Sequence, residues 1–110
     1  MQVLKNLIQN AKQAYSYKNS NKHVELNIYD IGDEDYIFCD VSDNASGILI
    51  EHKDKIFVPF FTTKKNTGGT GLGLSLSRSI VRGMDGDLYL KDTGAKGTIF
   101  CLKLRKSKTD

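Results

Sequence analysis

The sequence predicts an α+β fold, a two-layer sandwich with helices packed on one face of a mixed β-sheet. Two observations lead to this expectation: apolar residues recur at helical spacing near the start of the chain and again after residue 71, and they alternate with polar residues elsewhere. Elements in this order favour helices gathered on one side of a single sheet. A chain of 110 residues suffices for one domain with one core.

The first helix is expected from Gln2 to about Tyr17. Asn6 and Asn10 lie one turn apart on it, at the border of its apolar stripe. An amide oxygen at this border can ligate Mg²⁺, which prefers hard oxygen donors. It can equally satisfy a nearby backbone group, and the residues alone leave both readings open. The stripe consists of Leu4, Leu7, Ile8, Ala11 and Tyr15.

An antiparallel hairpin is expected next. Val24, Leu26 and Ile28 alternate with polar residues, which is typical of a half-buried strand, and a second strand covers residues 36–41. A short helix is expected over residues 51–57.

Asp43 follows the second strand and opens the segment Asp43–Gly47. Strand parity puts Asp43 on the same face as Cys39 and Val41, so its carboxylate is expected to point toward the covered side of the sheet. A carboxylate in an apolar cleft needs hydrogen-bond donors, and the exocyclic amine of adenine is one. Gly47 would let a base approach the backbone. The alternative is an Asx turn that only ends the strand.

A polar stretch from Pro59 to Thr70 shows no periodicity and predicts a mobile loop. Glycines from Gly68 onward then open a second helix, where free N–H groups and the helix dipole favour an anion. A P-loop would have lysine in place of Leu74, so this is a phosphate loop of another kind or a flexible linker. The helix begins near Gly71 and carries Leu76, Ile80 and Met84.

Two strands close the chain, over residues 87–91 and 98–104. Cys39 and Cys101 lie in apolar stretches, where a free cysteine behaves as a small hydrophobe. The cysteines lack CxxC spacing and the two histidines are far apart, which argues against a metal cage and for a reducing, cytoplasmic compartment.

The composition excludes some classes of function. The net charge of +3 comes largely from a basic tail, and no basic stripe alternates with aromatic residues, so nucleic acid is not an expected partner. No apolar run approaches the roughly 20 residues that a membrane span needs, so no membrane contact is expected of this domain.

Five motifs, in order along nearly the whole chain, resemble the conserved boxes of sensor histidine kinases. Each motif alone is weak, but the ordered set is specific. In the terms of that family they are an N box, a first glycine box, a phenylalanine box, a second glycine box and a closing Gly-Thr motif. They occupy Asn6–Ala14, Asp43–Ile48, Phe57–Lys64, Gly69–Leu74 and Gly97–Phe100.

The resemblance implies that residues 1–110 form an ATP-binding catalytic domain with the Bergerat fold and a flexible ATP lid. ATP and Mg²⁺ are then the cofactors, with Asn10 as the Mg²⁺ ligand and Asp43 as the adenine ligand. The γ-phosphate would pass to a histidine on a separate dimerisation domain, and from there to a response regulator. The implied ATP-binding residues are Asn6, Asn10, Asp43, Gly47, Ile48, Lys64, Gly69, Thr70, Gly71, Leu72, Gly73, Leu74 and Thr98.

The implied parent is a homodimer, either cytoplasmic or anchored in the inner membrane. His23 and His52 lack helical surroundings, so the phosphoacceptor is expected outside this chain. Ala45 stands where the family usually has glycine, and a positive φ there would cost on the order of 1 kcal/mol. Two alternatives remain: an ATPase of the same fold that uses ATP as a conformational clamp, and a degenerate nucleotide-binding module.

Overall fold

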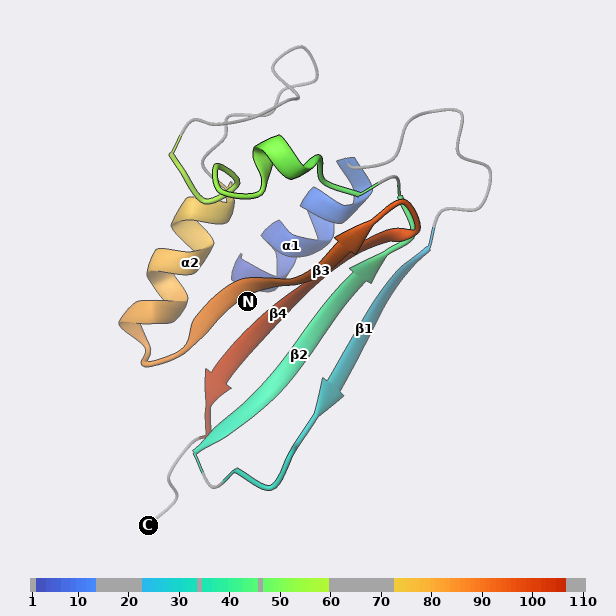
Figure 1. The fold of residues 1–110 in the computed structure, drawn as a ribbon. Coiled ribbons are helices and arrows are strands. Elements are labelled where there is room, and N and C mark those ends of the chain that lie inside the picture. The colour runs from blue at the N-terminus through green and yellow to red at the C-terminus, as the bar shows by residue number, and fades with distance from the viewer. Residues whose placement is uncertain (1, 14–22, 34, 46, 60–72, 107–110) are drawn as a thin grey trace.

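The computed structural model describes residues 2–13, 23–33, 35–45, 47–59 and 73–106, and they form two layers (Figure 1). One layer is a four-stranded sheet, and the other consists of two helices on one of its faces. The predicted sandwich with helices on one face is therefore confirmed. The elements are α1 (Gln2–Gln13), β1 (Val24–Tyr29), β2 (Tyr36–Asp43), α2 (Gly73–Gly83), β3 (Asp87–Gly94) and β4 (Gly97–Arg105).

The strands pair in the order β1-β2-β4-β3, and all three pairings are antiparallel. β1 and β2 form the predicted hairpin, and β4 inserts between β2 and β3. In the described part of the chain the sheet is thus antiparallel, where a mixed one was predicted. The reason is that both outer pairs are hairpins and that β2 and β4 also run in opposite directions.

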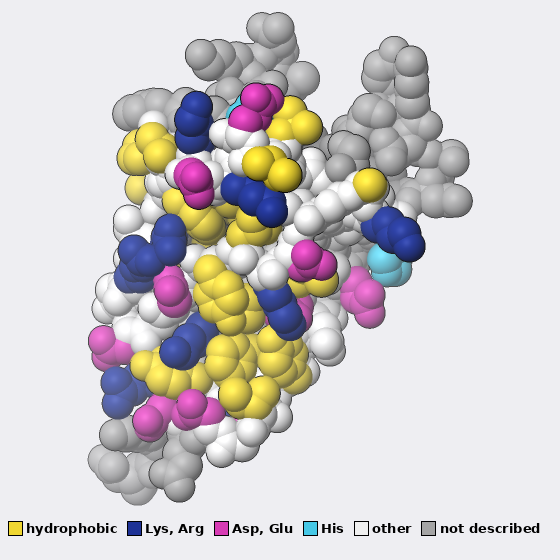
Figure 2. Space-filling view, viewed as in Figure 1, with side chains coloured by type: hydrophobic (Ala, Val, Ile, Leu, Met, Phe, Trp, Pro, Cys, Tyr) yellow, Lys and Arg dark blue, Asp and Glu magenta, His cyan; other side chains and the backbone are white. Residues whose placement is uncertain are grey.

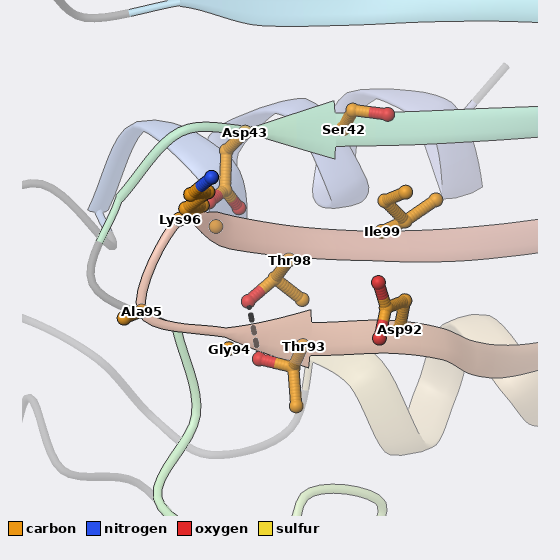
Figure 3. Close-up of a pocket in the computed structure, with 10 residues that line it drawn as sticks. Ser42, Asp43, Asp92, Thr93, Gly94, Ala95, Lys96, Thr98 and Ile99 are labelled. Atoms are coloured by element: carbon orange, nitrogen blue, oxygen red, sulfur yellow. Dashed lines mark hydrogen bonds between the residues drawn. The ribbon is translucent and has the colours of Figure 1, made fainter.

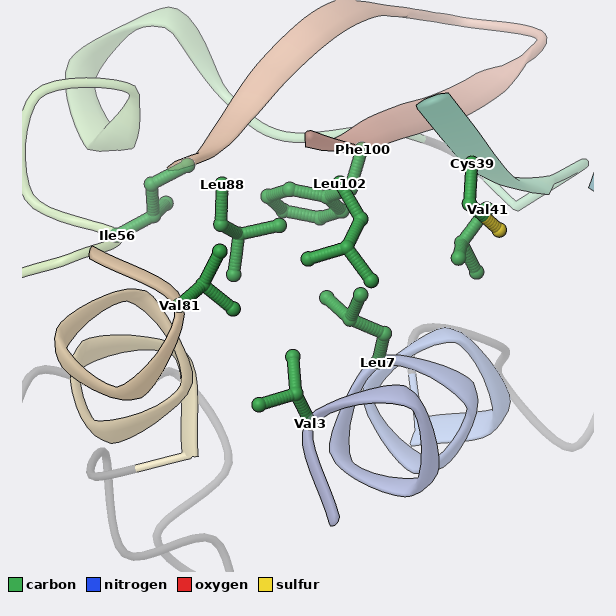
Figure 4. Packing of buried hydrophobic residues seen from close by; sticks show 9 residues of the cluster. All are labelled: Val3, Leu7, Cys39, Val41, Ile56, Val81, Leu88, Phe100 and Leu102. Atoms are coloured by element: carbon green, nitrogen blue, oxygen red, sulfur yellow. The ribbon is translucent and has the colours of Figure 1, made fainter. Parts of the chain in front are cut away.

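The core fills the space between the helices and the sheet (Figure 4). α1 buries Val3, Leu7 and Ala11, which recur every fourth residue and therefore share one face of the helix. The sheet contributes the alternate residues of β2 and β4 that face the helices, so the predicted inward parity of Cys39 and Val41 is confirmed. The cluster comprises Val3, Leu7, Cys39, Val41, Ile56, Val81, Leu88, Phe100 and Leu102.

β1 is less buried than its alternation predicted. Val24 packs against the core, but Leu26 and Ile28 are 43% and 67% exposed. β1 is an edge strand, and its far end extends beyond the two helices (Figure 1). Apolar alternation therefore identified the strand but not how far the covering layer reaches.

The prediction of a helix over residues 51–57 is wrong. The chain forms a three-residue 3-10 helix, η1 (Ile50–His52), and then a series of turns. Successive turns close through bonds such as the one that Val58 N–H donates to the Lys55 carbonyl, at 2.9 Å. The segment still buries Ile56, so it packs on the core without a regular helix.

α1 ends at Gln13, and its predicted continuation to Tyr17 lies outside the described residues. The loop predicted to be mobile extends from Pro59 into the range 60–72, which also lies outside them.

α2 confirms the second predicted helix, and it carries two different faces. Ser77 and Val81 are fully buried. On the outside of α2, Leu76 and Ile80 are 52% and 45% exposed. Met84, in the turn just after the helix, continues the spacing and is 50% exposed. An apolar stripe on the outside of a helix is a candidate surface for another protein.

On the face of the sheet opposite the helices, side chains of the strands bond to one another. Lys91 Nζ lies 2.6 Å from Asp40 Oδ2 and 3.2 Å from the Tyr29 hydroxyl. Burial favours the neutral form of Asp40, but hydrogen bonds from Lys91, Cys101 and Tyr29 outweigh it and hold the pKa of this carboxyl below its usual value. Hydrophobic side chains gather over the strands in Figure 2, with basic side chains between them. Cys101 lies buried on this face and Cys39 on the other, and both are free thiols.

Candidate functional site

Asp43 is the last residue of β2, at the end of the sheet where the β3–β4 turn also lies (Figure 1). Its carboxylate Oδ1 accepts the Ala45 N–H at 3.1 Å, which is the geometry of an Asx turn. The Asx turn that was the alternative prediction for this segment is therefore present in the structure. It does not exclude a ligand, because a carboxylate has about four lone-pair sites and this bond uses one of them.

Two glycines hold the loop after β2 against the β3–β4 turn. Gly47 has φ +88° and Gly97 has φ +138°, and residues other than glycine rarely adopt such backbone angles. A Cβ on Gly47 would lie 2.1 Å from the Gly94 carbonyl oxygen, and one on Gly97 would lie 1.9 Å from the Asp43 carbonyl oxygen. The room at Gly47 that was expected to admit a base is thus filled by the backbone of Gly94.

Ala45 does not carry the strain that a positive φ would impose. Among the described residues, the one residue other than glycine with a positive φ is Asp85, at +63°. Ala45 is 2% exposed and adopts an ordinary conformation, so the cost considered for this position does not arise.

Three polar side chains form a row across the sheet at this end, on the face that carries the helices (Figure 3). Asp43 of β2 lies opposite Thr98 of β4, and Thr98 lies opposite Thr93 of β3. The two threonine hydroxyl oxygens are 2.8 Å apart. Thr93 Oγ1 also accepts the N–H of Ile48 at 2.8 Å. The row therefore joins the loop after β2 to the last hairpin.

Sequence reasoning missed Thr93. The predicted third strand stopped at residue 91, whereas β3 continues to Gly94. The pairing of β3 with β4 shifts register between Leu90 and Asp92. Such a bulge leaves one residue unpaired and reverses the alternation beyond it, which brings Thr93 onto the same face as Thr98. The three contiguous residues 91–93 carried no apolar alternation that would have revealed the bulge.

A pocket of about 370 Å³ opens at this end of the sheet, around the β3–β4 turn (Figure 3). Asp43, Thr93 and Thr98 line it together with the turn itself. Ser42 and Ile99 also line it, although strand parity puts them on the opposite face. The pocket therefore wraps over the end of the sheet, and only its part on the helix side coincides with the candidate site.

The two asparagines of α1 differ in their surroundings. Asn6 Nδ2 donates to the Ser77 hydroxyl at 3.2 Å, which ties α1 to α2. Ser77 is fully buried, so this amide contributes to helix packing. Asn10 lies one turn further along α1 and is half-buried, at the border predicted from the sequence. Its amide oxygen is a hard donor of the kind that Mg²⁺ takes.

The first turn of α2 begins at Gly73, and its early N–H groups have no partner within the helix. The Leu74 side chain packs against the core, so a role of this residue toward a phosphate would fall to its backbone. The remaining predicted phosphate residues lie outside the described residues. They are Lys64, Gly69, Thr70, Gly71 and Leu72.

Arg78 of α2 fixes the segment before residue 60. Its guanidinium carbon lies 4.3 Å from the centre of the Phe57 ring, and Phe57 meets Phe100 of the core edge to face at 6.2 Å. Arg78 Nε is also 3.6 Å from Asp87 Oδ1. Aromatic packing and a cation over the ring hold the end of this segment beside α2.

No group of three or more His, Cys, Asp or Glu side chains that could hold a metal ion occurs among the described residues. Within the same part of the chain, neither helix is long and apolar enough to cross a membrane.

Comparison with known proteins identifies relatives across nearly the whole chain. The family model of histidine kinase-, DNA gyrase B- and HSP90-like ATPases matches residues 1–108. The two-component sensor PprA of Pseudomonas aeruginosa is 37% identical over 105 residues, which are 94% of this chain and 11% of that protein. The chain thus spans about a tenth of the length of this relative.

Two solved structures resemble the fold. The catalytic domain of the histidine kinase ThkA, in a nucleotide-free form, superposes with a TM-score of 0.75 and 34% identity, over 97% of this chain and 67% of the other. The mycobacterial sensor histidine kinase MprB gives a TM-score of 0.80 at 21% identity, over 98% of this chain and 72% of the other. The second likeness concerns the fold alone.

Proposed function

The chain belongs to the family of histidine kinase-, DNA gyrase B- and HSP90-like ATPases, and we propose that it transfers the γ-phosphate of Mg·ATP to a histidine on a separate helical domain. It is an ATP-binding catalytic domain of the type found in two-component sensor kinases. The observation that carries the proposal is the row of Asp43 and Thr98 at the end of the sheet, beside a loop built around Gly47.

In this proposal the Asp43 carboxylate, which also accepts the Ala45 N–H, accepts the exocyclic amine of adenine. Thr98 is 4% exposed and lies directly opposite Asp43, so its hydroxyl borders the same pocket. The loop of Gly47 and Ile48 is tied to the pocket lining, since the Ile48 N–H donates to Thr93. Thr98 is buried and Asp43 is half-buried, and a polar pair of this kind discriminates against a base that leaves it unpaired.

The phosphates would lie toward the first turn of α2, at the N–H groups of Gly73 and Leu74. Gly69, Thr70, Gly71, Leu72 and Lys64 complete this part of the proposal.

The donor set fits Mg²⁺. The ion favours octahedral coordination by oxygen and keeps several waters, so one amide oxygen from Asn10 beside phosphate oxygens is sufficient. When bound, the ion neutralises charge on the phosphates. The contribution of the chain is to hold Asn10 on a rigid helix whose face is anchored by Leu7 and Ala11. Asn6 contributes by its bond to Ser77, which fixes α1 against α2.

The partner is a helical hairpin with the phosphoacceptor histidine, in a homodimeric parent that passes the phosphate to a response regulator. The exposed apolar residues Leu76, Ile80 and Met84 support a protein partner. They lie on and just after α2, the helix whose first turn is the proposed phosphate site. Transfer of this type needs positioning and charge neutralisation more than a base in the domain itself. The two free, buried cysteines support a cytoplasmic location.

Calorimetric titration with Mg·ATP and Mg·ADP tests the binding half of the proposal. Asp43→Asn should weaken both nucleotides by similar factors, equivalent to about 2 kcal/mol, because both carry the same base. Asp92→Asn is the matched control, since Asp92 lines the pocket near the same turn but on the opposite face. Equal affinities in wild type and Asp43→Asn would remove Asp43 from the site.

Transfer is tested by adding γ-labelled ATP and a separately prepared histidine hairpin from a relative such as PprA. Label on the histidine supports the proposal. Release of free phosphate without labelled histidine would instead indicate a clamp ATPase, and absence of nucleotide binding would indicate a degenerate module. Replacing Leu76 and Ile80 together by serine should reduce transfer and leave ATP affinity unchanged.

A further inference from the structure

Thr93 is the third member of the row that begins with Asp43. We infer that it is a base-positioning residue, which acts on a bound adenine through Thr98 and Ile48. This inference rests on the proposed ATP site and extends it to a position outside the five motifs. Three observations support it: the bulge that turns Thr93 toward the site, its two hydrogen bonds, and its place beside Thr98 in the pocket lining.

The bulge gives the residue its orientation. Along β3, Leu88 and Leu90 face the helices and Tyr89 faces away. Continued alternation would send Thr93 to the same side as Tyr89. Because Lys91 is left without a partner on β4, the alternation reverses, and Thr93 faces Thr98. Lys91 itself faces the opposite side of the sheet, where its Nζ lies 2.6 Å from Asp40 Oδ2.

The hydrogen bonds give the residue its function. Thr93 Oγ1 accepts the Ile48 N–H, and one of the two threonine hydroxyls donates to the other over 2.8 Å. If Thr93 donates, Thr98 keeps its own proton for a ligand acceptor; if Thr98 donates, it offers lone pairs alone. If Thr98 donates, its proton is fixed on Thr93; if it accepts, one of its lone pairs is fixed and the rotation of its hydroxyl is restricted.

The location explains why this matters for a base. Thr98 is buried and directly opposite Asp43, whose carboxylate is the proposed ligand of the adenine amine. Ile48 follows Gly47, whose backbone packs on Gly94 next to Thr93. The Thr93 hydroxyl therefore restrains both the Thr98 hydroxyl and the loop after β2. The two hydrogen bonds of Thr93 lead to Thr98 and to the loop after β2, both on the base side of the proposed site, so its effect should be confined to the base.

The test compares Thr93→Val with Thr93→Ser by calorimetry. Valine keeps the β-branched shape and removes the hydroxyl, whereas serine keeps the hydroxyl. Thr93→Val should bind Mg·ATP about tenfold more weakly, the factor that the loss of one hydrogen bond of about 1.4 kcal/mol gives. Thr93→Ser should stay within about twofold of wild type. Thr93→Ala, which also removes the hydroxyl, is the second truncation if valine prevents folding.

Two further ligands separate positioning from a merely structural role. Inorganic triphosphate with Mg²⁺ has no base, so Thr93→Val should bind it as wild type does. Inosine triphosphate carries a donor at N1 where adenine has an acceptor, so a freely rotating Thr98 hydroxyl should reduce the preference for ATP over this analogue. Equal losses for ATP and triphosphate, an unchanged preference, or a serine variant as weak as the valine one would each overturn the inference.

The two proposals fail in different ways. If wild type does not bind Mg·ATP, the proposed function falls, and the role of Thr93 falls with it. If wild type binds and Thr93→Val binds ATP equally well, the proposed function stands and only the role of Thr93 is lost. Urea unfolding of each variant shows that the protein compared is folded.

Discussion

Replacing Gly47 by alanine should lower both the stability of the fold and the affinity for nucleotide. Gly47 has φ +88°, and a Cβ there would meet the Gly94 carbonyl oxygen at 2.1 Å. Ordinary van der Waals contact begins near 3.4 Å, so the two backbones must separate by more than 1 Å. The separation would act directly on the bond from Ile48 N–H to Thr93, which spans the same contact at 2.8 Å.

The magnitude follows from two contributions. A non-glycine residue at positive φ costs roughly 1–2 kcal/mol. Loss of the Ile48–Thr93 hydrogen bond, with a partly buried N–H left behind, costs about 1–3 kcal/mol more. The free energy of unfolding of Gly47→Ala should therefore fall by about 2–5 kcal/mol. For a domain of this size, with a total stability of about 5–15 kcal/mol, this loss is large but need not prevent folding.

Two other glycines provide matched controls, to be measured by urea unfolding beside Gly47→Ala. Gly32 has the same φ of +88° and no atom within 4 Å of its added Cβ, so Gly32→Ala measures the conformational cost alone. Gly94 is the partner of Gly47 in the contact, but its own Cβ would point into open space. Gly94→Ala should therefore be close to neutral. Nucleotide affinity should drop for Gly47→Ala and stay unchanged for Gly32→Ala.

The reasoning is refuted if Gly47→Ala loses no more stability than Gly32→Ala. That result would mean that the Gly94 carbonyl moves away at no cost, and that the first glycine box is not tied to the last hairpin. A stability loss with full nucleotide affinity would show instead that the contact supports the fold but not the site.

Two further predictions concern the metal and the ion pair on the opposite face. Asn10→Ala should spare metal-free nucleotide binding and abolish the gain that Mg²⁺ provides, measured by calorimetry with Mg²⁺ and with EDTA; the helix should persist, since alanine is the better helix former. The pKa of Asp40 is lowered in the folded protein, so its ionised form stabilises the fold above the ordinary pKa of 3.8, and this contribution is lost as the pH falls through the lower folded value. Asp40→Asn should thus cost about 1–2 kcal/mol at pH 7 and progressively less below pH 3.8, as followed by urea unfolding across pH.

Strand parity sufficed to predict Asp43 because β2 is regular over its whole length. Once Cys39 and Val41 were read as inward, Asp43 had to share their face, and its pairing opposite Thr98 agrees. The spacing of Leu7 and Ala11 was equally informative for α1, although the predicted stripe omitted Val3, which is fully buried. These elements follow their periodicity, so local pattern and three-dimensional position agree.

Thr93 and Gly94 could not be predicted in this way. The residues of the bulge are polar and lie near the end of β3, so no apolar period marks the point where the alternation reverses. The demand on Gly47 comes from Gly94, which is distant in sequence and adjacent only after the sheet has formed. Whether a position tolerates a Cβ atom depends on its neighbours in space, and a single sequence does not show which residues those are.

α2 shows why apolar spacing identifies a helix better than its buried face. The residues at helical spacing, Leu76, Ile80 and Met84, are half or nearly half exposed, while the buried face includes a serine. Ser77 can be buried because Asn6 of α1 satisfies its hydroxyl, so a polar contact takes the place of an apolar one at the helix–helix contact. The apolar stripe is then free to serve another function. An exposed apolar stripe on the helix whose first turn is the proposed phosphate site suits docking of a second helical domain, and this is the reason to test transfer with Leu76 and Ile80 replaced.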